Sequence, residues 1–170
     1  EELGENADQP SGLLRLNVPR AAYMIILQPA LPEFLERYPN ISVEIVMENA
    51  LVDIVGKGFD AGIRFGDLLE KDMIALRIGP PISAHMIASP AYLEKRGTPL
   101  HPRDLQNRAC IRFRHVTTGQ IERWEFAKDG ETMEKVPNGH LIINDSEALV
   151  QSALDGLGIA YMIDDAWRPR

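Results

Sequence analysis

The sequence has little cysteine, few aromatic residues and no long apolar run. Cys110 is the only cysteine among 170 residues, so an internal disulfide is excluded. No stretch approaches the roughly 20 apolar residues that a membrane-spanning helix needs. The start of the sequence, EELGENADQPSG, lacks the basic and apolar regions of a secretory signal. We therefore expect a cytoplasmic protein, where thiols stay reduced.

Patterns typical of catalysis, metal binding and nucleotide binding are also missing. The four histidines have no spacing typical of a metal site. No serine or cysteine occurs with a histidine in a recognisable triad context, and the glycines at 56–62 match neither nucleotide-binding loop. The sequence therefore predicts no metal, no cofactor and no enzymatic activity.

The charged residues are unbalanced toward the acidic side. Lys and Arg number 18 against 25 Asp and Glu, which gives a net charge of −7. A hydrophobic content of 45% is typical of a globular chain. Because a surface of this sign repels phosphate groups, we expect these residues alone to bind neither DNA nor an anionic membrane.

The first half of the sequence alternates between strand and helix patterns. Leu14, Leu16 and Val18 recur at every second position, and Pro29 and Pro32 fall inside a helical pattern, which predicts a bend or a late start. The predicted elements are strands over 14–18, 41–47 and 60–65, a helix over 24–38 and a short helix over 51–55. This alternation predicts parallel strands with helical crossovers.

The second half changes character after a stiff Gly79-Pro80-Pro81 break. Ser89 and Pro90 are typical of a helix start, and Asp129-Gly130 is typical of a hairpin turn. Further predicted elements are strands over 74–78, 85–88, 110–114, 141–143 and 159–163, a helical turn over 102–105, a hairpin joining 121–127 to 132–136, and a helix from Asp145 or Ser146 to Gly156 that buries Leu149 and Leu154.

Several segments resemble, in order, the effector-binding (substrate-binding) domain of LysR-type transcriptional regulators. The segments are SGLLRLNVP, PALPEFLERYP, GFDAGIRFG, IASPAYLEKRGTPLHPRDL and NDSEALVQSALDGLGIAYMI. GFDAGIRFG and SPAYLEKRGTP are the most distinctive, and the resemblance covers about residues 11–167.

The resemblance implies an α/β fold of two lobes, like type 2 periplasmic binding proteins, with the ligand in a cleft between the lobes. We expect a linker over 1–11, a first lobe over 12–81 to which 164–170 return, and a second lobe over 82–163. The family's N-terminal helix-turn-helix and linker helix have no counterpart in these residues. The family also continues beyond the position of Arg170.

Candidate ligand-binding residues lie at the carboxyl ends of predicted strands, where helix N-termini offer N–H groups to anions. An ordinary turn, a strand edge, a plain linker or helix capping would explain the same residues without a ligand. The predicted effector-binding residues are Pro19, Arg20, Ala21, Ala22, Arg64, Phe65, Gly66, Ile82, Ser83, Asn144, Asp145 and Ser146.

Two other features have ordinary explanations. Arg112, Arg114 and His115 form a local basic cluster that could hold a carboxylate, but the solvated face of a strand is the favoured interpretation. Cys110 lies in an apolar strand and is predicted to be inert core.

The sequence thus predicts a regulatory domain that senses a small molecule, possibly a carboxylate or an aromatic acid. The alternatives are a periplasmic solute-binding receptor of the same fold and an enzyme on the same scaffold, which no catalytic pattern supports. DNA would be bound only through the absent helix-turn-helix. Surplus apolar residues predict a homodimer joining 24–47 to 146–155 of a second copy. These residues are Ile25, Ile26, Ala30, Val46, Ala148 and Val150.

Overall fold

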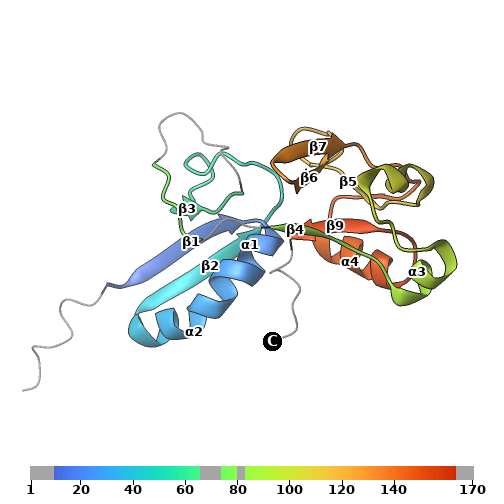
Figure 1. Ribbon diagram of the computed structural model, residues 1–170. Coiled ribbons are helices and arrows are strands. Elements are labelled where there is room, and N and C mark those ends of the chain that lie inside the picture. The colour runs from blue at the N-terminus through green and yellow to red at the C-terminus, as the bar shows by residue number, and fades with distance from the viewer. Residues whose placement is uncertain (1–9, 66–73, 80–82, 164–170) are drawn as a thin grey trace, which may run out of the picture. The chain divides into compact units, whose positions relative to one another are not determined.

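The computed structural model describes residues 10–65, 74–79 and 83–163, which form two compact units, Glu1–Pro81 and Ile82–Arg170 (Figure 1). Gly66, Ile82, most of the predicted linker and the predicted return of 164–170 lie outside the described residues.

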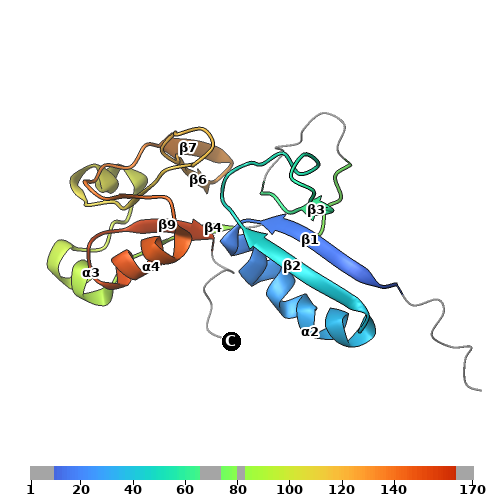
Figure 2. The same ribbon diagram turned by 180° about the vertical axis from the view of Figure 1, so that it is seen from behind.

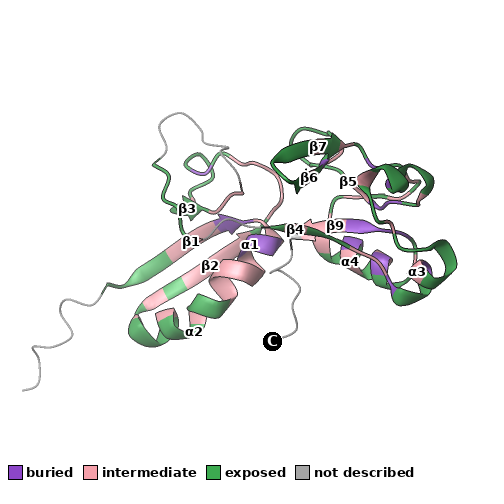
Figure 3. Cartoon of the chain, viewed as in Figure 1, coloured by how far each residue is buried: buried purple, intermediate pink, exposed green. Residues whose placement is uncertain are grey.

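The first unit contains a parallel sheet, as the alternating pattern predicted. Its strands are β1 (Gly12–Val18), β2 (Ile41–Met47) and β3 (Ala61–Gly62), in the order β2-β1-β3. β1 pairs along its whole length with β2 and over two residues with β3. Figure 3 shows β1 passing from exposed at its start to buried at its end, and Val18 is fully buried. The core of this unit therefore lies at the carboxyl end of the central strand.

One continuous helical segment follows β1, and it begins earlier than the sequence predicted. It comprises α1 (Arg20–Ala22), the π-helical η1 (Tyr23–Leu27) and α2 (Gln28–Arg37), and Figure 2 shows it beside β2. The wide π turn ends at Leu27, two residues before Pro29. A proline removes one helical donor, and a π turn is a recognised local adjustment of a helix. The chain therefore meets the proline with a wider turn instead of a late start.

Two predicted elements that fall in the first unit are wrong. Residues 51–55 form no helix, because the Asp53 carboxylate accepts a hydrogen bond from Gly56 N–H at 2.8 Å and the chain closes into turns over 54–58. Side-chain acceptors of this kind compete with helix formation. Residues 74–78 form no strand, and Ile74 and Leu76 are 91% and 80% exposed. No strand among the described residues pairs with this segment, so its alternating pattern does not lead to a β-ladder.

The second unit is built from short strands and helices close to those predicted. Ser89 accepts a hydrogen bond from Tyr92 N–H at 3.2 Å and so caps α3. Asp129 and Gly130 have φ of 53° and 82°, as the predicted hairpin turn requires. The elements are β4 (Ala84–Ile87), α3 (Pro90–Arg96), the 3-10 helix η2 (Pro102–Asn107), β5 (Arg112–Phe113), β6 (Trp124–Lys128), β7 (Glu131–Lys135), β8 (Ile142–Ile143), α4 (Ser146–Leu154) and β9 (Ala160–Ile163).

Three strand pairs tie this unit together. β4 pairs antiparallel with β9, β5 pairs parallel with β8, and β6 with β7 forms the hairpin. The predicted strand over 110–114 is shorter, because only β5 pairs regularly and Cys110 and Arg114 form isolated bridges. Leu149 of α4 is buried as predicted, but Leu154 is 58% exposed, because the buried face of α4 runs through Leu149 and Ala153.

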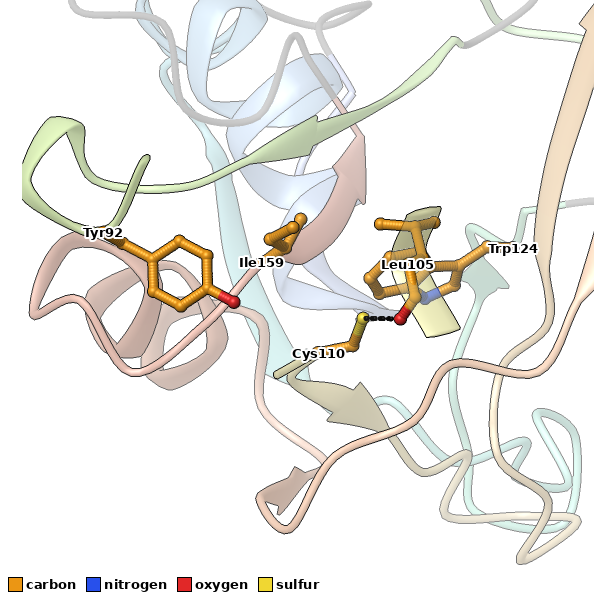
Figure 4. Close-up of a cluster of buried hydrophobic side chains, with 5 residues drawn as sticks. All are labelled: Tyr92, Leu105, Cys110, Trp124 and Ile159. Atoms are coloured by element: carbon orange, nitrogen blue, oxygen red, sulfur yellow. Dashed lines mark hydrogen bonds between the residues drawn. The ribbon is translucent and has the colours of Figure 1, made fainter. Parts of the chain in front are cut away.

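Two clusters of buried side chains form the core of the second unit. The first gathers Tyr92, Leu105, Cys110, Trp124 and Ile159 (Figure 4). The second joins Ile111 and Ala160 to the buried face of α4. Tyr161 stacks on Trp124 with ring centroids 5.5 Å apart.

The Cys110 thiol is inside the first of these clusters, as the sequence predicted. Desolvation by burial raises its pKa to about 11, although a backbone hydrogen bond from Asn138 and the charge of Lys135 act in the opposite direction. A thiol of this kind carries little thiolate at neutral pH.

Two glycines allow other backbone segments to cross very close to the Ala109–Cys110 segment. A Cβ atom on Gly158 would lie 2.5 Å from the Ala109 carbonyl oxygen, and one on Gly139 would collide with the Cys110 carbonyl. Ile159 N–H donates to that Ala109 oxygen at 2.9 Å. Close crossing and hydrogen bonding therefore depend on residues without side chains.

Candidate functional site

The three strands of the first unit end together, and the chain after each end carries a charged residue. The register pairs Val18 with Met47 and Asn17 with Gly62. The ladder continues one step further on both sides, because Glu48 N–H donates to Val18 at 3.0 Å and Ile63 N–H to Asn17 at 3.1 Å. Glu48, Arg20 and Arg64 therefore follow the carboxyl edge of one sheet.

The helix that begins at Arg20 starts at this same edge. Its N-cap is Pro19, with φ of −64° and ψ of 147°. Proline has no side-chain oxygen that could accept from the N–H groups of the first turn, unlike the residues that usually cap helices. Ala21 and Ala22 are buried and bring the first turn tightly against the sheet, whereas Arg20 is half-buried. The positive end of the helix dipole thus lies at the strand ends.

Asn17 connects two of the charged residues. Its side chain is fully buried. The amide oxygen accepts from the Arg64 guanidinium at 2.5 Å, and the amide nitrogen donates to the Glu48 carboxylate at 3.1 Å. Arg64 also donates to the backbone carbonyls of Asn17 and Ile63, at 3.0 and 2.7 Å. The Arg64 head group is therefore fixed by β1.

Sequence reasoning predicted Arg64 at this edge but missed Asn17 and Glu48. The period-two pattern of β1 put Asn17 on the polar face together with Arg15. β1 is the central strand, however, so the Asn17 face is covered by the chain that follows β3. An amide close to the end of an apolar strand was the available signal, and it was not recognised. Phe65, the next predicted residue, is half-buried.

The predicted residues of the second unit belong to the start of α4. Asp145 is its N-cap, and its carboxylate accepts from the N–H groups of Glu147 and Ala148 at 3.1 and 3.0 Å. Ser146 is the first residue of the helix, and Asn144 is exposed just before the cap. Ser83 is exposed and precedes β4. The capping that we considered as an ordinary explanation for Asp145 is therefore present.

The basic cluster of the second unit separates into two environments. Arg114 and His115 are exposed, and Arg114 donates to the Gly119 carbonyl. Arg112 is half-buried, and its Nε has no hydrogen-bond partner among the residues that the structure describes. Two of the three residues thus fit the solvated strand face that the alternation predicted.

Neither a metal centre nor a spanning helix is found in the parts of the chain described. Within residues 10–65, 74–79 and 83–163, no three His, Cys, Asp or Glu side chains gather closely enough to hold a metal ion. Over the same ranges, every helix is too short or too polar to cross a membrane.

The fold is that of a regulatory domain that binds an effector. Residues 7–169 match the LysR substrate binding domain, and the chain belongs to this family. It is 39% identical over 163 residues to the uncharacterized HTH-type transcriptional regulator YcaN of Escherichia coli K12, covering 96% of this chain and 53% of that protein. It is 34% identical to the HTH-type transcriptional regulator PgrR of the same organism, covering 94% and 54%.

Solved structures of regulators have the same fold. CrgA, a LysR-type transcriptional regulator from Neisseria meningitidis, is similar with a TM-score of 0.78 and 25% identity, over 92% of this chain and 52% of that chain. The regulatory domain of the C227S variant of AphB from Vibrio vulnificus gives 0.74 and 26%, over 91% and 76%. The two-lobed α/β fold class and the family predicted from the sequence are confirmed.

The chain spans about half the length of the curated relatives it matches. These relatives are transcriptional regulators, which favours the regulatory domain over the periplasmic receptor that we also considered.

Proposed function

We propose that this domain senses a small anionic effector, a carboxylate or an aromatic acid, through the carboxyl edge of the sheet in its first unit. The observation that carries the proposal is the meeting of a helix N-terminus with Arg20 and Arg64 at that edge. Free N–H groups and the helix dipole favour an anion there. An arginine adds charge and paired donors that match a carboxylate.

The charges at this edge support an anion over a cation. Arg20 and Arg64 supply two positive charges, and Glu48 supplies one negative charge that Asn17 Nδ2 contacts. Asn17 is the positioning residue in this proposal, since it holds the Arg64 guanidinium in place before a ligand arrives. Preorganisation of this kind lowers the entropy that binding costs.

The remaining predicted residues stay part of the proposal, each within its own unit. Pro19, Ala21 and Ala22 shape the helix start, and Phe65 with Gly66 follows Arg64 along the chain. In the second unit Ser83, Asn144 and Ser146 would contribute polar groups, with Ile82 preceding Ser83. Asp145 would act indirectly by holding the first turn of α4.

A thermal-shift screen with small aliphatic and aromatic carboxylates tests the proposal. Arg20→Ala should abolish most of the stabilisation by the carboxylate that binds best, because it removes a charge at the helix start. Arg20 suits this test better than Ala22, since Ala22 is fully buried and a larger side chain would damage the core.

Lys57→Ala is the matched control, because Lys57 is an exposed cation of the same unit in the turn before β3. Stabilisation should be unchanged in this variant. If no carboxylate stabilises the chain, or if Arg20→Ala and Asn17→Ala both respond like the wild type, the assignment is wrong.

We also propose the setting in which this sensing takes place. The domain would act in the cytoplasm as part of a regulator that contacts DNA through a helix-turn-helix outside these residues, and without catalysis of its own. The net charge of −7 supports this arrangement, because an acidic domain is repelled by the phosphate backbone and the helix-turn-helix would make the DNA contacts.

A homodimer is the remaining part of the proposal, with residues 24–47 of one copy against 146–155 of the other. Exposed apolar side chains in both ranges support it, and they include Leu35, Met47 and Leu154 at 45%, 42% and 58% exposure. Ile25, Ile26, Val46 and Val150 are half-buried, and Ala30 and Ala148 are exposed. Apolar patches of this kind commonly mark contacts between proteins.

A further inference from the structure

A cavity of about 440 Å³ lies within the second unit, and all of its lining residues belong to that unit. It is bounded by α3, by the chain from the C-cap of α4 onward, and by the end of η2 with Ala109. Small-molecule sites commonly have volumes of about 300–1,000 Å³. Its side chains of interest are Tyr92, Lys95, Arg96, Asn107, Asp155 and Leu157.

Hydrogen bonds to Ala109 fix two of the segments that line the cavity. Tyr92 is 8% exposed, and its hydroxyl accepts from Ala109 N–H at 3.1 Å and lies 3.4 Å from the Ala109 carbonyl, to which it donates. Figure 4 shows the Tyr92 ring beside Ile159 in the core. The chain after α4 is tied to the same segment, because Ile159 N–H donates to Ala109. The cavity is therefore formed before any ligand binds.

Charges of opposite sign line this cavity without pairing. Lys95 and Arg96 come from the last turn of α3, and Asp155 is the C-cap of α4. Among the described residues, the side chain of neither cation makes a hydrogen bond or an ion pair, and the Asp155 carboxylate accepts only from the Gln151 amide, at 2.9 Å. Elsewhere in the chain, Arg15 and Glu44 do pair, at 2.8 Å.

The other lining residues supply one polar group and an apolar surface. Asn107 offers an amide whose hydrogen bonds are not used within the described chain. Tyr92, Ala91 and Leu157 offer apolar surface. Both helices also direct their C-terminal ends at the cavity, and these ends carry partial negative charge.

We propose that this cavity binds a small zwitterion, an α-amino acid with an apolar side chain. Lys95 and Arg96 hold the carboxylate, because two cations on one helix turn match its charge. Asp155 and the C-terminal end of α4 hold the ammonium group. The side chain lies against Tyr92 and Leu157, and Asn107 completes the polar contacts. The proposal is independent of the effector site, since none of the residues that line the cavity is among the predicted effector-binding residues.

The test is an NMR titration of the 15N-labelled chain with L-alanine, L-valine, L-leucine and L-phenylalanine. We expect saturable shifts at the amides of Gly156 and Leu157 and at the Asn107 side-chain amide. For the amino acid that binds best, the N-acetyl derivative lacks the ammonium and the amide derivative lacks the carboxylate. Each should bind at least about ten-fold more weakly, which is about 1.4 kcal/mol.

Variants separate the two charged walls. Lys95→Ala with Arg96→Ala should weaken the amino acid at least about ten-fold, and Asp155→Asn should do the same while keeping an acceptor for Gln151. Lys128→Ala removes an exposed cation of the same unit and should bind like the wild type. All of these positions are exposed, so thermal melts should show the folded state retained.

Three results would overturn the proposal. One is the absence of saturable binding by all four amino acids. Another is equal binding of the N-acetyl derivative, which would mark a site for anions in general. The third is a set of shifts confined to the first unit, which would assign the amino acid to the proposed effector site instead.

Discussion

At the scale of single residues, Glu122 is a carboxylic acid placed where its charge is poorly solvated. Its backbone N–H donates to Phe113 at 2.9 Å, and its side chain makes no hydrogen bond or ion pair with the described residues. Desolvation by burial, with the nearby charge of Glu125, raises its pKa to about 7. An ordinary pKa returns when the chain unfolds.

Glu122→Gln should therefore change how stability depends on pH. Between about 4.5 and 7 the folded chain holds a proton that the unfolded chain releases, so stability falls as pH rises through this window. The variant lacks this loss and should melt at a higher temperature than the wild type at pH 8, with little difference at pH 5. Glu131→Gln, an exposed control in the same unit, should show no such trend. A difference in melting temperature between Glu122→Gln and wild type that is the same at pH 5 and pH 8 would contradict the prediction.

Cys110 gives a second prediction at this scale. Burial and a pKa near 11 leave little thiolate at pH 8, and the thiolate is the reactive form. The folded chain should react with a thiol reagent such as dithionitrobenzoate far more slowly than the chain in denaturant, which should react in full. Equal rates in the two conditions would show that the thiol is accessible.

The residue scale is also where sequence reasoning was weakest. Arg20 and Arg64 were placed correctly at strand ends, because parallel topology alone determines where such residues fall. Asn17 was not recognised, because the burial of its face of β1 depends on contacts with Ile63 and Arg64, which lie far along the chain from it. Alternation within one strand does not contain that information.

At the scale of elements, the cap of α4 is a measurable part of the stability of the second unit. Asp145→Ala removes the acceptor of two backbone N–H groups and should cost about 1 kcal/mol, within the range of roughly 0.5–2 kcal/mol seen for such caps. Asp145→Asn keeps an acceptor oxygen and should cost much less. Urea denaturation of both variants measures the difference, and equal losses would assign the effect to charge instead of capping.

Elements with their own chemical start and stop signals were predictable. Ser89, Asp129-Gly130 and Gly156 marked a helix start, a hairpin and a helix end that the structure contains. Residues 51–55 and 74–78 were predicted from apolar patterns that end at glycines, and neither segment had a start signal of its own. In the first case a side-chain acceptor closed a turn, and in the second no strand was available among the described residues to pair with it.

At the scale of the whole molecule, the proposed dimer gives a test by mass. Light scattering at tens of micromolar should show two copies, and Leu154→Asp should shift the chain toward one copy because it places a charge in the apolar contact. Leu100→Asp is the control, since Leu100 is 92% exposed and lies outside both ranges. A monomeric wild type, or a Leu154→Asp variant that stays dimeric, would refute this interface.

The close crossings at Gly139 and Gly158 have a consequence for inheritance. A methyl group at either position would meet a carbonyl oxygen of the backbone, which cannot rotate away as a side chain can. In a library of random variants selected for regulation, these two codons should tolerate no replacement. Gly79, whose surroundings are open over 4 Å, should accept many. Amino-acid replacement during the evolution of this domain is thus constrained at two positions where only a hydrogen atom fits in place of a side chain.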